Sequence, residues 1–142
     1  MANGNGGFGF RIGSSSSFAT VEEAAHAYAH EIADHGPGRF DVVMLGLGPD
    51  GHVASLFPGF PQLEESDHAA TSIADSPKPP PARVTLTFPA LLNTKELWLM
   101  TAGAERAEIV KAINDGEDLP ATRVAAHPAA TLFLDRTAAA AL

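Results

Sequence analysis

Residues 40–45 read Phe-Asp-Val-Val-Met-Leu, a short and nearly all-apolar run that ends in a glycine-rich segment. Such a run is typical of a central parallel strand whose side chains are buried on both faces of the sheet. Its neighbours in the sheet are expected at residues 83–87, 96–101 and 131–134. Because strands alternate with helices, the chain is predicted to be an α/β domain with a mostly parallel sheet flanked by helices.

The longest predicted helix covers residues 20–35. Thr20 can cap its N-terminus, and apolar residues recur at helical spacing to form one stripe, which we expect to cover one face of the sheet. A second helix is predicted at residues 105–114, where apolar residues again have helical spacing. Shorter helical segments are expected at residues 52–57, 88–92 and 136–142.

The chain has 142 residues, which suits one domain of ordinary size, and we place this domain at residues 18–142. Residues 1–17 are Gly/Asn-rich and end in a serine tract, so they are expected to form a flexible leader, with at most a short strand at residues 8–12. Residues 59–81 are polar and rich in proline, and we expect no regular structure there.

Composition narrows the class of function. No stretch approaches the ~18 apolar residues of a membrane helix, and the absence of cysteine excludes disulfides and thiol nucleophiles. That absence also fits a reducing compartment, so we expect a cytoplasmic protein. Nine Lys and Arg against 17 Asp and Glu give a net charge of -8, so neither nucleic acid nor a membrane is expected as a partner.

The segment Gly-Leu-Gly-Pro-Asp-Gly, followed by a histidine, comes directly after the central strand. Open α/β sheets bind ligands at the carboxyl ends of their strands, and Gly46, Gly48 and Gly51 can let backbone N–H groups converge on an oxyanion or phosphate. At the start of a short helix, His52 would stay neutral and act as a general base, with Asp50 capping the helix or orienting the ring. The alternative is a glycine turn with an incidental histidine.

Other motifs in the sequence are less well supported. The three glycines match the dinucleotide fingerprint, but the segment after them breaks at Pro58, and no second strand ending in an acid follows about 20 residues later. His26, His30 and His35 suggest a metal site, but their spacing on the helix favours a solvated polar face. The chain has no Gly-x-Ser-x-Gly elbow, so a serine hydrolase is not supported.

Residues 40–59 resemble the signature of the 6-phosphogluconolactonase family, residues 76–87 are similar to its second block, and residues 98–107 to its third. The blocks occur in the family's order, and the resemblance covers residues 18–142. The sister family, glucosamine-6-phosphate deaminase, shares the fold but is expected to read Gly-His-Ile-Ala-Phe-Asn-Glu-Pro at the glycine turn. This chain has Gly-His-Val-Ala-Ser-Leu-Phe-Pro there, which favours the lactonase.

The resemblance implies hydrolysis of the δ-lactone of 6-phosphogluconate in the pentose phosphate pathway, with no metal or organic cofactor. His52 falls on the family's catalytic histidine, which activates water, and Asp50 falls on the acid that supports it. Lys78 and Arg83 fall on a cationic loop that faces the phosphate or carboxylate of the substrate. Since residues 59–77 carry four acids and no Lys or Arg, these two cations would supply the compensating charge. Plain solvated charge is the alternative.

Members of the resembled family are considerably longer at the N-terminus, where they carry a first strand, a glycine-rich phosphate loop and an Arg-bearing block. None of these occurs in residues 1–20. The chain is therefore expected to be an apparently truncated domain of the Rossmann-like sugar-phosphate isomerase/lactonase type. An exposed sheet edge would favour self-association. A deaminase-like enzyme and a non-catalytic remnant are the alternatives to a lactonase.

Overall fold

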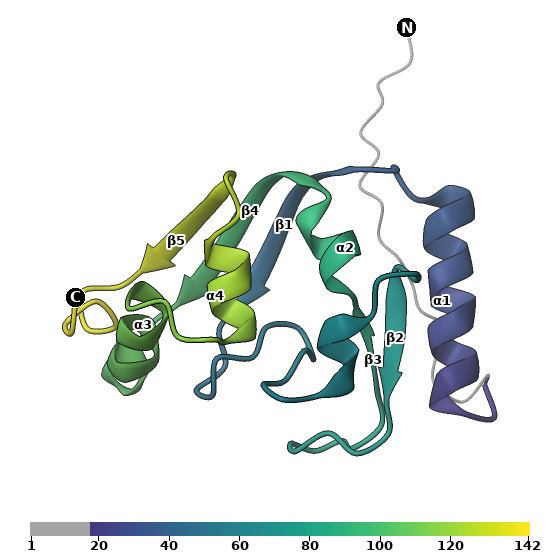
Figure 1. The fold of residues 1–142 in the computed structure, drawn as a ribbon, viewed down its shortest axis with the longest axis horizontal. Coiled ribbons are helices and arrows are strands. Elements are labelled where there is room, and N and C mark those ends of the chain that lie inside the picture. The colour runs from purple at the N-terminus through teal and green to yellow at the C-terminus, as the bar shows by residue number, and fades with distance from the viewer. Residues whose placement is uncertain (1–17) are drawn as a thin grey trace, which may run out of the picture.

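In the computed structural model, which describes residues 18–142, a three-stranded parallel sheet forms the centre of the fold (Figure 1). Its strands, in spatial order, are β1 (Phe40–Gly46), β4 (Thr94–Thr101) and β5 (Ala130–Leu134). Two pairs of apolar residues, Val43 with Leu97 and Leu45 with Leu99, lie in register on β1 and β4. The predicted α/β class is confirmed, whereas the predicted leader, with its short strand, lies outside the described residues.

Three helices cover one face of this sheet: α2 (Phe88–Leu92), α3 (Ala107–Asn114), which follows the 3-10 turn η3 (Ala104–Arg106), and α4 (Pro120–Ala125). Figure 1 shows α2 and α4 in front of the sheet. Each helix contributes buried apolar residues to a single core, which it shares with the alternate residues of β1 and β4 that face it. The helical residues in this core are Phe88, Leu91, Val110, Ile113, Ala121 and Val124.

The other face of the sheet is not covered by any of the described helices. Val42 is 41% exposed, Met44 57% and Phe133 46%, and the ring of Trp98 packs against that of Phe133 with centroids 5.4 Å apart. The prediction that β1 is buried on both faces is therefore wrong. Only Val43 and Leu45, which point to the same face of the strand, enter the core. A strand buries a face only where another element packs on it.

A separate antiparallel hairpin lies beside the main sheet, formed by β2 (Ala70–Ile73) and β3 (Arg83–Leu86). Helix α1 (Val21–His35), capped by the side chain of Thr20 as predicted, packs against this hairpin and not against the main sheet. β3 pairs with β2 and not with β1, so the expectation that residues 83–87 join the main sheet is wrong, and so is the expectation that the first helix covers that sheet. β2 and the 3-10 turn η2 (Pro61–Glu64) also lie in a region where we expected no regular structure.

Two predicted helices are absent and one helix was not predicted. Residues 52–57 form turns closed by a bridge between Val53 and Leu56, and residues 136–142 form turns anchored on Asp135. The helix that was missed is α4, which begins with a proline after an irregular segment. Within residues 18–142, no helix has both the length and the apolar character that crossing a membrane requires.

Candidate active site

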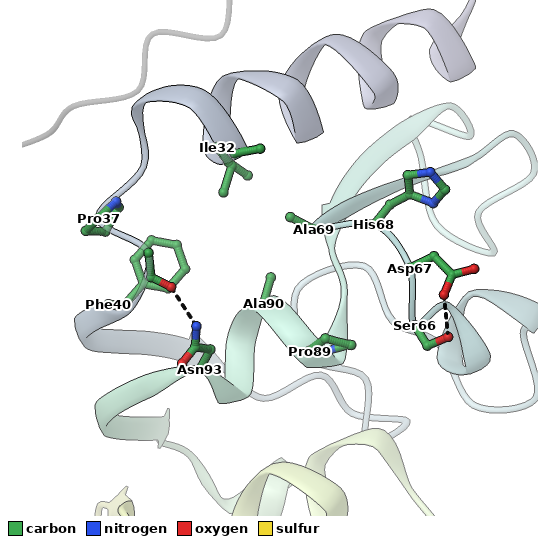
Figure 2. Close-up of a pocket in the computed structure, with 12 residues that line it drawn as sticks. Ile32, Pro37, Phe40, Ser66, Asp67, His68, Ala69, Pro89, Ala90 and Asn93 are labelled. Carbon is green, nitrogen blue, oxygen red and sulfur yellow. Dashed lines mark hydrogen bonds between the residues drawn. The ribbon is translucent and has the colours of Figure 1, made fainter.

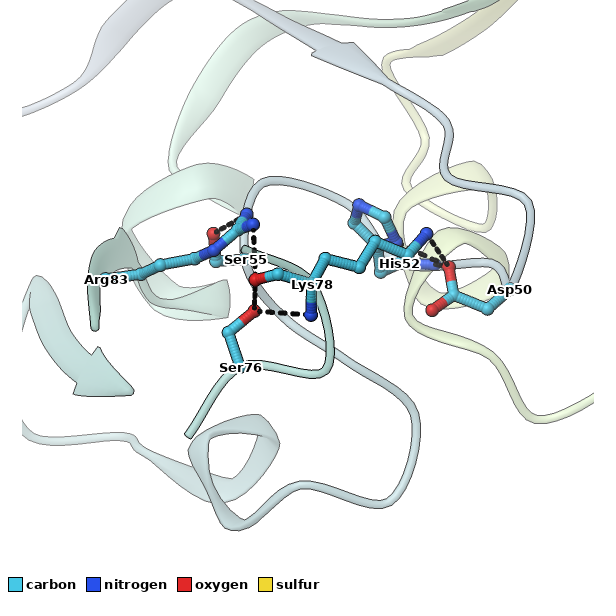
Figure 3. Close-up of polar contacts among 6 residues, drawn as sticks. All are labelled: Asp50, His52, Ser55, Ser76, Lys78 and Arg83. Atoms are coloured by element: carbon cyan, nitrogen blue, oxygen red, sulfur yellow. Dashed lines mark hydrogen bonds and ion pairs between the residues drawn. The ribbon is translucent and has the colours of Figure 1, made fainter. Parts of the chain in front are cut away.

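The turn after β1 brings His52 and Asp50 together at the carboxyl end of the strand (Figure 3). Nδ1 of His52 lies 2.5 Å from Oδ1 of Asp50, and the backbone N–H of His52 donates to the same oxygen at 3.4 Å. A carboxylate can only accept here, so we assign the ring proton to Nδ1 and the free lone pair to Nε2. Nε2 has no hydrogen-bond partner within residues 18–142. The ring is therefore held in the tautomer that a general base needs.

The glycines of the turn have different structural roles. A Cβ at Gly48 would overlap the ring of His52, and Gly51 has a φ of 80°, in the left-handed region that favours glycine. A Cβ at Gly46 would meet nothing within 4 Å. The amide of Gly48 donates to the carbonyl of His52 and that of Gly51 to the carbonyl of Gly48. Both amides are therefore used within the turn, and the predicted contact of the three glycines with an anion stays a prediction.

The charge of Asp50 is set by its surroundings. Partial burial would raise the pKa of this carboxyl, but the hydrogen bond and charge of His52, together with backbone N–H groups, outweigh burial and hold the pKa below its usual range. The carboxylate therefore stays ionised and can stabilise an imidazolium on His52, whose side chain is 16% exposed. The predicted effect of a helix dipole on His52 does not apply, because no helix begins at this residue.

Lys78 reaches the same carboxylate from a different part of the chain. It lies in the loop between β2 and β3, and its Nζ is 3.6 Å from Oδ1 of Asp50. Its side chain is 37% exposed, so the ammonium group is accessible to a ligand from solvent. Three of the residues predicted from the sequence, Asp50, His52 and Lys78, therefore form one cluster (Figure 3).

Arg83 lies at the start of β3 and points its guanidinium into the same loop. Nε donates to the carbonyl of Pro80 at 3.0 Å, and Nη2 donates to the carbonyls of Lys78 and Pro79, both at 2.9 Å. Nη1 lies 3.4 Å from Oγ of Ser55. The structure brings Arg83 to the site, but most of its donors are already used by the protein. Its predicted contact with the substrate stays a prediction.

Sequence reasoning missed three residues that connect the turn to its surroundings. Thr85 is buried, and its hydroxyl accepts the N–H of Ser55 at 3.1 Å. The buried ring of Phe57 lies 4.7 Å from the ring of His52 and 5.7 Å from the guanidinium carbon of Arg83. All three fall inside the quoted motifs, but nothing in their residue types marks them as part of a site.

Residues 10–133 match a family model described as glucosamine-6-phosphate isomerases/6-phosphogluconolactonase. The chain belongs to this family. It is 40% identical over 150 residues to the 6-phosphogluconolactonase of Mycobacterium tuberculosis, an alignment that covers 100% of the chain and 57% of that protein. It is 42% identical over 127 residues to the human 6-phosphogluconolactonase, covering 84% of the chain and 49% of that protein. The resemblance predicted from the motifs is therefore confirmed.

Solved structures of the family share the fold. A crystal structure of 6-phosphogluconolactonase from Thermotoga maritima superposes with a TM-score of 0.72 at 32% identity, covering 84% of the chain and 52% of that protein. A monomeric glucosamine-6-phosphate deaminase superposes with a TM-score of 0.69 at 23% identity, which shows the fold alone. The chain spans about half the length of the curated relatives that it matches.

A cavity of about 290 Å³, whose lining includes none of Asp50, His52 and Lys78, lies between the C-terminal end of α1, the loop before β2 and the start of α2 (Figure 2). Its polar groups are paired within the protein: Ser66 donates to Asp67 at 3.2 Å, and Asn93 donates to the carbonyl of Gly38 at 2.6 Å. Across residues 18–142, no three His, Asp or Glu side chains gather in a way that could hold a metal ion. The predicted histidine face of α1 is exposed to solvent, as expected.

Proposed function

We propose that the chain carries the hydrolytic site of a 6-phosphogluconolactonase, which converts 6-phospho-D-glucono-1,5-lactone to 6-phosphogluconate, a step of the pentose phosphate pathway. The observation that carries the proposal is the 2.5 Å contact between Nδ1 of His52 and Asp50, which leaves Nε2 free to accept a proton. The names of the relatives support the phosphorylated sugar lactone as substrate. No nucleic acid or membrane partner enters this proposal.

In the proposed mechanism, Nε2 of His52 takes a proton from a water molecule as its oxygen attacks the lactone carbonyl carbon. The new C–O bond gives a tetrahedral intermediate, and Asp50 stabilises the imidazolium through Nδ1. When the intermediate collapses, the bond between the carbonyl carbon and the ring oxygen breaks. His52 returns its proton to that oxygen, so the products are a carboxylic acid and a hydroxyl group, and the base is regenerated.

Lys78 is the group that we assign to the anionic end of the substrate. The chain has a net charge of -8, so an anionic ligand needs a local cation to approach. Nζ of Lys78 lies 3.6 Å from Oδ1 of Asp50, in a partly exposed ion pair. Exposed pairs of this kind contribute little stability, so a phosphate or carboxylate can compete for the ammonium group at small cost.

The substitution His52→Asn tests the proposal directly, because it removes the base and leaves the size of the side chain similar. We expect the rate of lactone hydrolysis to fall by about 10² to 10⁴-fold, the range for a missing general base. His30→Asn on the exposed face of α1 is the matched control and should keep the wild-type rate. An unchanged rate in a folded His52→Asn protein would remove His52 from the mechanism.

The two alternatives make different predictions in the same assays. A deaminase-like enzyme would release ammonia from glucosamine 6-phosphate, and a non-catalytic remnant would turn over neither substrate. The comparison with the deaminase structure rests on the fold, whereas the curated relatives named above are lactonases. Ammonia release without lactone hydrolysis would favour the deaminase.

We also propose self-association. The uncovered face of the sheet exposes the apolar side chains of Val42, Met44 and Phe133, and β1 lies at an edge of the sheet.

A further inference from the structure

We propose that Arg83 is a positioning residue, which fixes the loop that carries Lys78, and not a residue that contacts the substrate. The inference deepens the proposed function, and it rests on that function in taking Lys78 as the cation that binds the anionic ligand.

The loop between β2 and β3 has few backbone donors with which to hold its shape. Four of its residues are prolines, at positions 77 and 79–81, and a proline has no N–H to donate. Two of the N–H groups that remain are used locally: that of Ser76 reaches the carbonyl of Pro81 at 2.9 Å, and that of Lys78 lies 3.3 Å from Oγ of Ser76. The hydroxyl of Ser76 in turn donates to the carbonyl of Lys78 at 2.9 Å. Among the described residues, the carbonyls of Pro79 and Pro80 accept from Arg83, which lies just outside the loop.

Arg83 supplies these donors. A guanidinium has five N–H groups in a fixed planar fork, and here three of them reach the successive carbonyls of Lys78, Pro79 and Pro80 at 2.9 to 3.0 Å. A fourth points to the hydroxyl of Ser55 at 3.4 Å, which leaves one on Nη1. A lysine ammonium cannot span three carbonyls in this way, because its three donors start from a single atom.

The same guanidinium joins the loop to the catalytic turn. Its Nη1 contacts Ser55, and its carbon lies 5.7 Å from the centre of the Phe57 ring, which in turn lies 4.7 Å from the ring of His52. This bridge accounts for the 3.6 Å between Nζ of Lys78 and Asp50, two residues from segments that are far apart in the sequence. Among residues 18–142, Lys78 has a single, partly exposed ion pair to give up, whereas Arg83 would have to break three hydrogen bonds to loop carbonyls to bind a ligand.

A double-mutant cycle distinguishes positioning from direct contact. Calorimetry would measure the binding of 6-phosphogluconate and of unphosphorylated gluconate to wild type, Lys78→Ala, Arg83→Lys and the double variant. Arg83→Lys keeps the positive charge, yet we expect it to weaken 6-phosphogluconate binding about 10-fold or more, with little effect on gluconate. Since Arg83 acts through Lys78, the same change should add less than about twofold in the Lys78→Ala background. Multiplicative losses in the double variant would overturn the proposal and favour direct contact.

Hydrogen exchange of the Ser76 and Lys78 amides gives a second readout that does not depend on any activity. Arg83→Lys should speed their exchange, whereas Lys78→Ala should leave the amide of Ser76 protected. Arg136→Lys, on the exposed C-terminal segment, is the matched control and should change neither binding nor exchange. Arg83→Gln replaces Arg83→Lys if the latter does not fold.

The two readouts separate the failure of this inference from the failure of the proposed function. If wild type neither hydrolyses the lactone nor binds 6-phosphogluconate, the proposed function fails. Faster exchange in the Arg83 variant would then still support the loop clamp. Unchanged exchange in a folded Arg83 variant would overturn the clamp, whatever the activity of wild type.

Discussion

Gly48→Ala is the smallest change that should disable the proposed site, because it adds one methyl group where the histidine ring lies. A Cβ at position 48 would overlap the ring of His52, including the Nδ1 atom that contacts Asp50. The backbone at this position needs no left-handed φ, so the substitution tests the close approach alone. We expect the ring to rotate away from Asp50 and the general base to lose its position.

The expected fall in activity follows from the loss of general-base catalysis by His52. A misplaced base forfeits the ~10² to 10⁴-fold that general-base catalysis supplies, which corresponds to about 3–5 kcal/mol in the activation barrier. Overpacking in a closed core costs ~1–3 kcal/mol in the free energy of unfolding. His52 is 16% exposed, so its ring has a route toward solvent, and we expect the lower end of that range. Activity should therefore fall much more than stability.

The assay is kcat/KM for lactone hydrolysis, measured beside urea unfolding on the same preparations. Gly46→Ala is the matched comparison, because a Cβ there meets nothing within 4 Å although the residue lies in the same segment. We expect its loss to be at least tenfold smaller than that of Gly48→Ala. Equal losses in the two variants, or a wild-type rate for folded Gly48→Ala, would refute the reasoning.

Three further predictions concern the charge of Asp50, the uncovered face of the sheet and a buried threonine. The pKa of Asp50 is lowered by folding, so its ionised form stabilises the fold above the unfolded pKa of about 3.9, and this contribution is lost as pH falls through the lower folded pKa. The difference in melting temperature between wild type and Asp50→Asn should therefore shrink as pH falls through these two pKa values. A constant difference would contradict the lowered pKa of Asp50. Met44→Lys should reduce self-association in sedimentation velocity while costing less than about 0.5 kcal/mol, because Met44 is exposed; unchanged association would exclude this face. Thr85→Val removes the acceptor of the Ser55 N–H and should cost about 1–3 kcal/mol in urea unfolding, more than Thr85→Ser, and the reverse order would be evidence against this bond.

Local patterns in the sequence were sufficient to predict the strands of the main sheet, α1 and the glycine turn before His52. They failed where the conformation depends on residues distant in sequence. β2 has Thr71 and Ser72 at its centre and becomes a strand because β3 pairs with it. The predicted helix after His52 is replaced by turns, in which Ala54 has a φ of 50° and Leu56 donates to the carbonyl of Val53.

The burial of β1 shows a second limit of sequence reasoning. Its apolar residues indicate a strand that can be buried on both faces, but residue types do not say which elements cover each face. Val43 is buried because α2, α3 and α4 pack on its side, whereas Met44 points to the face that no described helix covers.

Arg83 shows that the role of a charge is equally hard to predict from residue type. A cation beside a loop predicts anion binding, but here the guanidinium donates to the carbonyls of the neighbouring prolines.

The proposed chemistry and the uncovered sheet face can be tested separately, because they involve different parts of the chain. Asp50 and His52 lie in the turn after β1, and Lys78 and Arg83 come from the hairpin, which packs against α1. Met44 lies on the opposite face of the sheet from the core that supports this turn. A substitution at Met44 should therefore change the association state without changing the contact between His52 and Asp50. If Met44→Lys yields a monomer that has lost hydrolysis while His52 stays folded and in place, the site depends on association, and the four residues named here are not sufficient for turnover.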